Sequence, residues 1–494
     1  MSVSTTILKS DLLELRTIGL ITTFLLLMWP VAEAQAGRLE AGTFEAHDTL
    51  GTTNRTPDFV PFQEPFDEAP IVVAISDSNG GNSASIRITN VTTTGFDELI
   101  LEPDNWDGRH LAQATQYIAV EPGRHLLSDG TIIEAGFVDL TNVQFGTGFS
   151  GGVASWRSVN FSAPMLGTPI ILHQLQSANS ETRNVGNQSS RPHITSIAQS
   201  PSPTGFQLAI ERSQANSGPF PSSERIGWIA IQSGQNGSFP NTSGTTINWS
   251  TRTSPANIRG WADGCFDTVH GLPGAANPVV IAKKISRNNE DGGWFRYCTI
   301  NSATIGLRVD EDRDQDNERS IDTADAESAA IIAFSQSFHA NLRADLGVTK
   351  VNTGAINVNG SDFNVPGATV SYLITVFNSG NAPPAQGSIF VTDELPAQLA
   401  LLLADFGAAG SGPVEFTDGS PATTVTCAFV SFSATNDCFS FSTDGSDFSY
   451  VPADSGDGTD PNVRFIRIQP SGIMNAEAGA GPPNFELRFR AKIR

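Results

Sequence analysis

The chain has 494 residues, of which 39% are hydrophobic and 16% are charged, and its formal net charge at pH 7 is −22. This hydrophobic content is enough for ordinary cores, so the composition excludes a disordered chain, and the length predicts about three or four domains of roughly 100–150 residues each. The negative charge argues against nucleic acid and anionic membrane surfaces as partners, because both are bound through basic patches.

The first 36 residues have the pattern of an export signal. An almost wholly apolar run at 18–28 follows Lys9 and Arg16, and small residues at 32–36 offer a cleavage site. The alternative is a membrane anchor, but the run is shorter than the roughly 20 residues that span a bilayer. We interpret residues 1–36 as a signal peptide. No later stretch is apolar enough to cross a membrane, so the mature chain is expected outside the cell or at its surface, without a membrane span.

Three copies of one unit follow the leader. Each copy opens with an apolar run that starts at a proline and closes with a second apolar run of strand length. The opening runs are at 70–73, 169–172 and 278–281, and the closing runs are at 117–120, 228–231 and 331–334. A period of about 100 residues is too long for a solenoid and matches whole domains. We therefore predict three repeats, at 37–128, 129–240 and 241–340.

Each repeat is predicted to be an antiparallel β-sandwich. Ile86 and Ile88 alternate with Arg87 and Thr89, a pattern that indicates a strand with one face buried and the other in water. No amphipathic helix of convincing length interrupts the repeats, and the segment at 322–329 is expected to be a connection.

Residues 341–494 have a different character and are predicted to form a fourth β-domain of immunoglobulin type. Val370, Tyr372, Ile374 and Val376 alternate as in a half-buried strand, and a second alternating strand at 485–493 closes the chain. The whole protein is therefore expected to be all-β, with tandem antiparallel sandwiches.

Four cysteines fit a protein exported to an oxidising compartment. Cys265 and Cys298 fall inside the third repeat, and Cys427 and Cys438 fall inside the C-terminal domain. A zinc site is the alternative, but neither a Cys-x-x-Cys motif nor a paired His spacing accompanies them. We predict two structural disulfides, Cys265–Cys298 and Cys427–Cys438.

The three repeats resemble the H-type lectin domain, a six-stranded antiparallel sandwich. The resemblance is carried by the second repeat, through Val159-x-Phe161, the run at 169–171, Gly205-Phe206 and the closing run at 227–231. It implies binding of sugars of the N-acetylgalactosamine type and assembly into trimers, so a homo-oligomer is expected as well.

The C-terminal domain resembles the conserved-repeat domain of unknown function that is common in bacterial cell-surface proteins. The matching residues are Lys350, Gly367-x-x-Val370-x-Tyr372, the turn at 378–380 and the segment at 391–396. This second resemblance implies an immunoglobulin-like fold and a place at a bacterial surface.

The most sugar-like stretch contains Asp104, Asn105, Trp106 and Arg109. A loop tryptophan supplies a face on which a sugar ring can stack, while the polar side chains offer directional hydrogen bonds to hydroxyl groups. The alternative is an ordinary hydrogen-bonded turn whose tryptophan packs on the edge of the sandwich.

A second candidate loop, for a metal, contains Asp312, Asp314 and Asp316. Alternate carboxylates can converge on one calcium ion, so calcium is the one cofactor that this loop would bind; no other cofactor is expected. The pattern departs from a calcium loop where Asn317 replaces glycine and Thr323 replaces the bidentate glutamate. A solvated acidic hairpin is the alternative.

The sequence predicts no catalytic centre. The seven histidines are scattered, and no HExxH, GxSxG or phosphate-binding loop is present. We therefore expect a non-enzymatic, exported carbohydrate-binding or adhesion protein, whose repeats gain avidity for glycans or cell-surface polysaccharide from several weak sites. One alternative is a structural spacer or assembly protein without sugar binding; another is an accessory region of a polysaccharide-degrading enzyme.

Overall fold

The computed structural model describes most of the chain after the predicted signal peptide; residues 1–36 lie outside the described part. The described residues are 37–47, 57–103, 106, 110–127, 130–145, 154–180, 193–212, 222–312, 317–356, 360, 363–384, 387–477 and 481–494.

The described chain is all-β, as predicted. Its strands form eight sheets, antiparallel except for one short parallel pair, β9 (Val143–Gln144) beside β13 (Gly205–Arg212). Within the described residues the helical elements are two 3-10 turns, η1 (Trp261–Asp263) and η2 (Thr323–Asp325). The second lies in the segment that was expected to be a connection.

Six of the sheets form three sandwiches. Each sandwich has a four-stranded sheet and a second sheet built on three antiparallel strands, to which β9 adds a short fourth strand in sandwich two. In sandwich one the four-stranded sheet has the order β22 (Phe338–Leu342), β1 (Gly37–Ala46), β6 (Gln113–Val120) and β3 (Ile71–Ser76). Its three-stranded sheet has the order β2 (Asp58–Pro61), β5 (Gly95–Leu101) and β4 (Ser85–Thr89).

Sandwiches two and three repeat this plan. The sheets of sandwich two are β11 (Pro169–Leu175), β14 (Glu224–Gln232), β8 (Ile132–Leu140), β7 (Gly123–Leu126), and β10 (Arg157–Asn160), β13, β12 (Ile194–Ser202). The sheets of sandwich three are β15 (Asn236–Pro240), β16 (Thr246–Thr253), β21 (Ala329–Phe334), β18 (Val279–Lys284), and β17 (Phe266–Val269), β20 (Thr304–Asp310), β19 (Trp294–Ile300).

A strand exchange links the three sandwiches in a closed ring. The strand that follows the last core strand of each sandwich pairs with the first strand of the next: β7 with β8, and β15 with β16. The third such strand, β22, returns to pair with β1, where Phe338 lies opposite Ala41 and Leu342 opposite Gly37. Each four-stranded sheet therefore takes one edge strand from its neighbour.

The four-stranded sheets also share one hydrophobic core. Ile118, Ile229 and Ile332, which occupy equivalent places in β6, β14 and β21, belong to this core and are fully buried. The other face of each sheet packs on the second sheet of its own sandwich, for example Ala119 and Phe96 in sandwich one. The central strands are thus buried on both faces, which explains why the sequence shows them as unbroken apolar runs.

The prediction that Arg87 points into water is wrong. Arg87 is 1% exposed, because the outer face of β4 packs against sandwich two, where the guanidinium donates a 2.5 Å hydrogen bond to the Ile194 carbonyl oxygen. The alternation in β4 separates two buried environments, one apolar and one polar, rather than a core from solvent.

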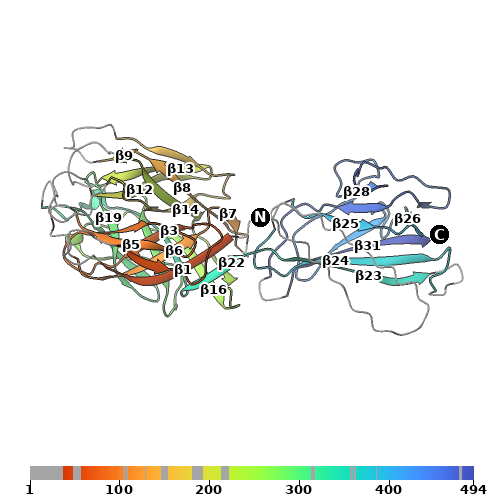
Figure 1. The fold of residues 1–494 in the computed structure, drawn as a ribbon, viewed down its shortest axis with the longest axis horizontal. Coiled ribbons are helices and arrows are strands. Elements are labelled where there is room, and N and C mark those ends of the chain that lie inside the picture. Colours follow the sequence, from red (N-terminus) through yellow and green to blue (C-terminus); the bar gives the residue numbers. More distant parts are fainter. Residues whose placement is uncertain are drawn as a thin grey trace.

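The C-terminal residues form a fourth sandwich, on the right in Figure 1. Its larger sheet has the order β23 (Leu346–Ile356), β24 (Thr369–Asn378), β31 (Asn484–Ile493), β26 (Leu399–Leu402) and β29 (Thr459–Asp460), with β27 (Val414–Asp418) also paired to β31. The smaller sheet has the order β25 (Val391–Glu394), β30 (Phe465–Ile468) and β28 (Phe439–Ser442).

Strand β24 alternates between buried and half-buried residues along its whole length, as predicted, with Val370, Tyr372, Ile374 and Val376 in the core. Lys350 connects the two sheets of this sandwich, because its ammonium on β23 lies 2.6 Å from Asp393 on β25. The pair is buried, and burial lowers the pKa of Lys350 against the opposing effect of the Asp393 charge.

Both predicted disulfides are formed. Cys265 and Cys298, whose Cα atoms are 6.4 Å apart, join the segment before β17 to β19; Cys427 and Cys438, at 5.4 Å, close a short loop of the C-terminal sandwich. Within the described part of the chain, no helix is long and apolar enough to cross a membrane.

Candidate functional site

The loop predicted to bind sugar connects β5 to β6. Trp106 is half-buried there, and its backbone N–H donates to the Pro103 carbonyl oxygen at 3.1 Å. Asp104, Asn105 and Arg109 lie outside the described residues. The structure therefore places one of the four predicted sugar contacts and leaves the other three as predictions.

A buried histidine fixes the end of this loop. The ring of His110 lies 3.2 Å from the Asn82 carbonyl oxygen and 2.8 Å from that of Leu111. Burial lowers the pKa of His110, whereas its contacts with the two carbonyl oxygens oppose that shift. The contact attaches the predicted sugar loop to the turn between β3 and β4.

Residues of sandwich three hold this β3–β4 turn in place. The Arg296 guanidinium donates to the carbonyl oxygens of Asp77, Asn79 and Asn82 at 3.0, 2.6 and 3.1 Å. Arg319 donates to the Gly81 carbonyl oxygen at 2.9 Å. The support for the loop therefore crosses from one sandwich to the next.

The predicted calcium loop occupies the corresponding place in sandwich three, between β20 and β21. Asp312 is fully buried, while Asp314 and Asp316 lie outside the described residues. Burial lowers the pKa of Arg212 in sandwich two, and the charge of Asp312 opposes that shift, so this carboxylate faces a cation of the neighbouring sandwich.

The carboxylate at the start of the same loop is paired with arginines. Asp310 lies 2.9 Å from Arg296 and 2.5 Å from Arg319. These contacts show how an acidic segment is neutralised at the junction of two sandwiches. They describe the base of the loop and leave the calcium prediction itself untested.

A small cavity lies where the three sandwiches meet. It has a volume of about 40 Å³ and is lined by side chains of all three, including Arg87, His173 and Lys283. Burial, with the positive charge of Lys283, lowers the pKa of His173 to about 3, and the neutral ring contacts Ser196 and the Lys284 carbonyl oxygen. The cavity has room for ordered water but not for a sugar ring, so its groups fix the junction.

A larger hollow, of about 440 Å³, lies between β7 and the C-terminal sandwich. Its walls are mostly apolar, and Arg124, its main polar group, is occupied by Glu134 and by the carbonyl oxygens of Ala163 and Pro164. Sugars require several free hydrogen-bonding groups beside an aromatic face, so this hollow suits them poorly.

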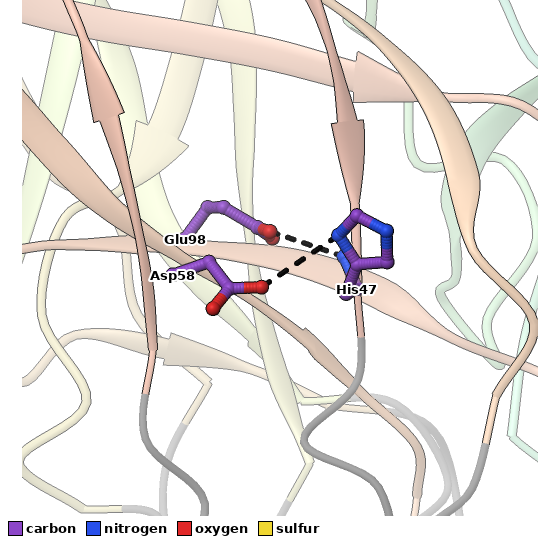
Figure 2. Close-up of side chains that lie close together, drawn as sticks. All are labelled: His47, Asp58 and Glu98. Atoms are coloured by element: carbon purple, nitrogen blue, oxygen red, sulfur yellow. Dashed lines mark hydrogen bonds and ion pairs between the residues drawn. The ribbon is translucent and has the colours of Figure 1, made fainter.

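A cluster of one imidazole and two carboxylates lies in sandwich one, where the end of β1 meets β2 and β5 (Figure 2). His47 follows β1, Asp58 begins β2, and Glu98 lies opposite Asp58 in the pairing of β2 with β5. The His47 Nδ1 atom is 3.6 Å from Asp58 Oδ2, and the His47 backbone N–H donates to Glu98 Oε1 at 3.0 Å. One ligand atom from each residue lies within 4.8 Å of the others.

The Glu98 carboxyl is the buried member of the cluster. It is 1% exposed, and its Oε2 atom has no hydrogen-bond partner among the described residues. Burial raises the pKa of Glu98 to about 8; the His47 N–H opposes this shift, and the Asp58 charge adds to it. The side chains of His47 and Asp58 are exposed to solvent, whereas the Glu98 carboxyl is buried.

Sequence reasoning did not find this cluster, because its members are 11 and 40 residues apart and match no spacing motif. One signal was present: Glu98 stands between Phe96 and Ile100 in an alternating strand, where the other repeats have Leu208 and Leu307. A carboxylate at a core position indicates a pairing or a ligand.

No family model, no curated protein and no solved structure matches this chain. The fold and the geometry of its sites are therefore the basis for the functional proposals that follow.

Proposed function

We propose that the protein is an exported, non-enzymatic carbohydrate-binding protein that presents three lectin-like sandwiches as one unit. The observation that carries the proposal is the closed ring of sandwiches around a shared core. The resemblance to H-type lectins implies trimer assembly, and three linked copies in one chain supply a three-part arrangement without separate subunits.

The recognition surface is assigned to the loops at the end of the ring that carries Trp106. The connections from β5 to β6, β13 to β14 and β20 to β21 are equivalent in the three sandwiches. Ser76 lies opposite Thr115 in the pairing of β3 with β6, so the turn after β3 and the loop before β6 leave sandwich one at the same end. Sugar binding at this end would use different loop residues in each copy.

A rigid support favours recognition by such a loop. Trp106 is held near the base of its loop, His110 attaches the loop to the β3–β4 turn, and Arg296 fixes that turn from sandwich three. A pre-organised aromatic side chain binds a sugar face with a smaller loss of conformational entropy than a mobile one. Several weak sites on one rigid body would then add avidity on a polysaccharide.

Export is supported by the two disulfides, because such bonds persist in oxidising compartments. The leader at 1–36 and the resemblance of the C-terminal domain to bacterial surface repeats extend this to a location at the cell surface.

A glycan array probed with the purified mature chain tests the proposal. Binding to one class of glycan, with terminal N-acetylgalactosamine as the first candidate, is expected. Trp106→Ala should weaken it at least about tenfold if sandwich one contributes a site, since one lost stacking contact is worth roughly 1–3 kcal/mol. Phe363→Ala serves as the control, because this exposed aromatic lies in the C-terminal sandwich.

Two results would contradict the proposal. Failure of the folded chain to bind any glycan would favour the spacer or assembly alternative, in which the ring is a structural unit. Equal binding by wild type and Trp106→Ala would reject the site in sandwich one, while leaving the other two sandwiches to be tested.

A further inference from the structure

Glu98 occupies a position that the fold reserves for an apolar side chain. On β5 it stands between Phe96 and Ile100, which face the core of sandwich one and are fully buried. In the strand registers, Leu208 of sandwich two and Leu307 of sandwich three hold the same place. A buried carboxylate costs free energy unless it meets a positive charge or coordinates a metal.

The groups around Glu98 can hold a cation. Oε1 is occupied by the His47 backbone N–H, and Oε2 is buried without a partner among the described residues. The Glu98 carboxyl group points toward the His47 ring and the Asp58 carboxylate, which together offer one nitrogen and one oxygen (Figure 2). The three donors come from both sheets of the sandwich, so they are brought together by the tertiary fold alone.

We propose that His47 Nδ1, Asp58 and Glu98 Oε2 bind a divalent transition-metal ion of the zinc class. Three ligands about 2.1 Å from a tetrahedral ion lie roughly 3.4 Å from one another, close to the 3.6 Å between His47 Nδ1 and Asp58 Oδ2. One ligand atom of Glu98 lies within 4.8 Å of the ligand atoms of His47 and Asp58. The fourth position is left to water or to a ligand on the solvent side.

The donor set decides the class of ion. Imidazole nitrogen with carboxylate oxygen suits zinc and its first-row neighbours, whereas calcium and magnesium prefer oxygen donors alone. This site is therefore separate in both place and chemistry from the calcium loop predicted at Asp312.

A fourth side chain orients the imidazole. Glu45 Oε1 lies 3.2 Å from His47 Nε2. A carboxylate that accepts a hydrogen bond from Nε2–H leaves Nδ1 unprotonated, with its lone pair available to a metal beside Asp58 and Glu98, as in many sites in which a carboxylate supports a histidine ligand. Glu45 is thus a positioning residue. A bound ion would join the end of β1 in one sheet to β2 and β5 in the other.

Titration of the metal-free, full mature chain with zinc chloride tests the site. Isothermal calorimetry should show one ion per chain at this site, and cobalt(II) should bind with the visible absorption of a low-coordinate complex. His47→Gln and Glu98→Leu should each weaken zinc binding more than about 100-fold, because each removes a ligand. Glu98→Leu is expected to fold, since leucine occupies this position in the other two sandwiches.

Two further variants make the result specific. Glu45→Gln should weaken zinc binding about tenfold and leave the stoichiometry unchanged, as expected for a residue that supports a ligand. Asp97→Asn, on the opposite face of β5, should leave binding unchanged. The proposal is overturned if the wild-type chain binds no zinc at 100-micromolar concentrations, roughly the weak limit for a specific site. It is also overturned if zinc binding survives in both His47→Gln and Glu98→Leu, or if calcium competes equally with zinc.

Discussion

Apart from the short strand β9 of sandwich two, sandwiches one and two have corresponding strands in the same order, yet they differ at three positions near one end of the fold. Ala46 and Glu98 of sandwich one stand where sandwich two has Leu140 and Leu208. In sandwich two the two leucines pack in the core, while in sandwich one a smaller residue leaves room for a buried carboxyl group.

The third difference lies beside these two. Asp139 of sandwich two pairs across the strands with Arg225 through two 2.9 Å contacts. The equivalent carboxylate of sandwich one is Glu45, whose cross-strand neighbour is Ala114, and it contacts His47 instead. At this end of the fold, sandwich two therefore has an apolar contact and an ion pair, whereas sandwich one has a cluster of possible metal ligands.

The largest effect is expected when the buried carboxylate is moved into sandwich two. Leu208→Glu would place a charge at a fully buried position in the apolar core of sandwich two, so we expect a loss of about 3–5 kcal/mol in the free energy of unfolding. Urea unfolding followed by tryptophan fluorescence measures it. Leu208→Met is the matched control, with a cost under about 1.5 kcal/mol. Equal stability of the two variants would show that this core tolerates a carboxylate.

The two sandwiches should also differ in how pH affects their stability. Strand β11 of sandwich two carries the titratable His173, whereas Ala74 occupies the equivalent position in β3 of sandwich one. The pKa of His173 is lowered to about 3, so the unfolded chain takes up a proton as pH falls below about 6.5, whereas the folded chain does not until near pH 3. This histidine alone should therefore remove about 3 kcal/mol of stability by pH 4, since each pKa unit is worth about 1.4 kcal/mol.

His173→Gln should flatten that acid limb, because glutamine keeps a hydrogen-bonding side chain without a titrating group. Unfolding by urea at pH 7 and at pH 4 provides the test. A variant with the same loss of stability as wild type between these two values would mean that other groups dominate the acid response.

A smaller effect is expected at Glu98 itself. Without metal, Glu98→Leu should raise the free energy of unfolding by about 1–3 kcal/mol at pH 7, because it removes a buried oxygen without a hydrogen-bond partner. Thermal unfolding in the presence of a chelator checks this. With saturating zinc the order should reverse, since wild type alone gains stability from binding.

The smallest effect is expected from Ala114→Arg, which would give sandwich one the cross-strand arginine of sandwich two. This arginine should draw Glu45 away from His47 and weaken zinc binding by a few-fold to about tenfold. Calorimetric titration measures the change. Unaltered affinity would mean that Glu45 contributes little to the orientation of the ring.

Much of the fold follows from local patterns in the chain. The alternation at 370–376 predicted the half-buried strand β24, and the apolar runs predicted the core strands of the three sandwiches. Both patterns are informative because a strand buried on one face alternates in polarity, whereas a strand buried on both faces is apolar throughout. The cysteine pairings were also predictable, since each pair falls within one domain.

The tertiary structure alone decided how these parts meet. The return of β22 to β1 closes the ring over nearly 300 residues of chain. The packing of sandwich one on sandwich two buries Arg87, whose place in an alternating strand predicts exposure. Likewise, His47, Asp58 and Glu98 come together only in the folded chain. The pairing of β2 with β5 places Asp58 opposite Glu98, and the end of β1 in the facing sheet brings His47 beside them. Polarity patterns report whether a side chain is buried, but the partner that buries it depends on contacts between distant segments.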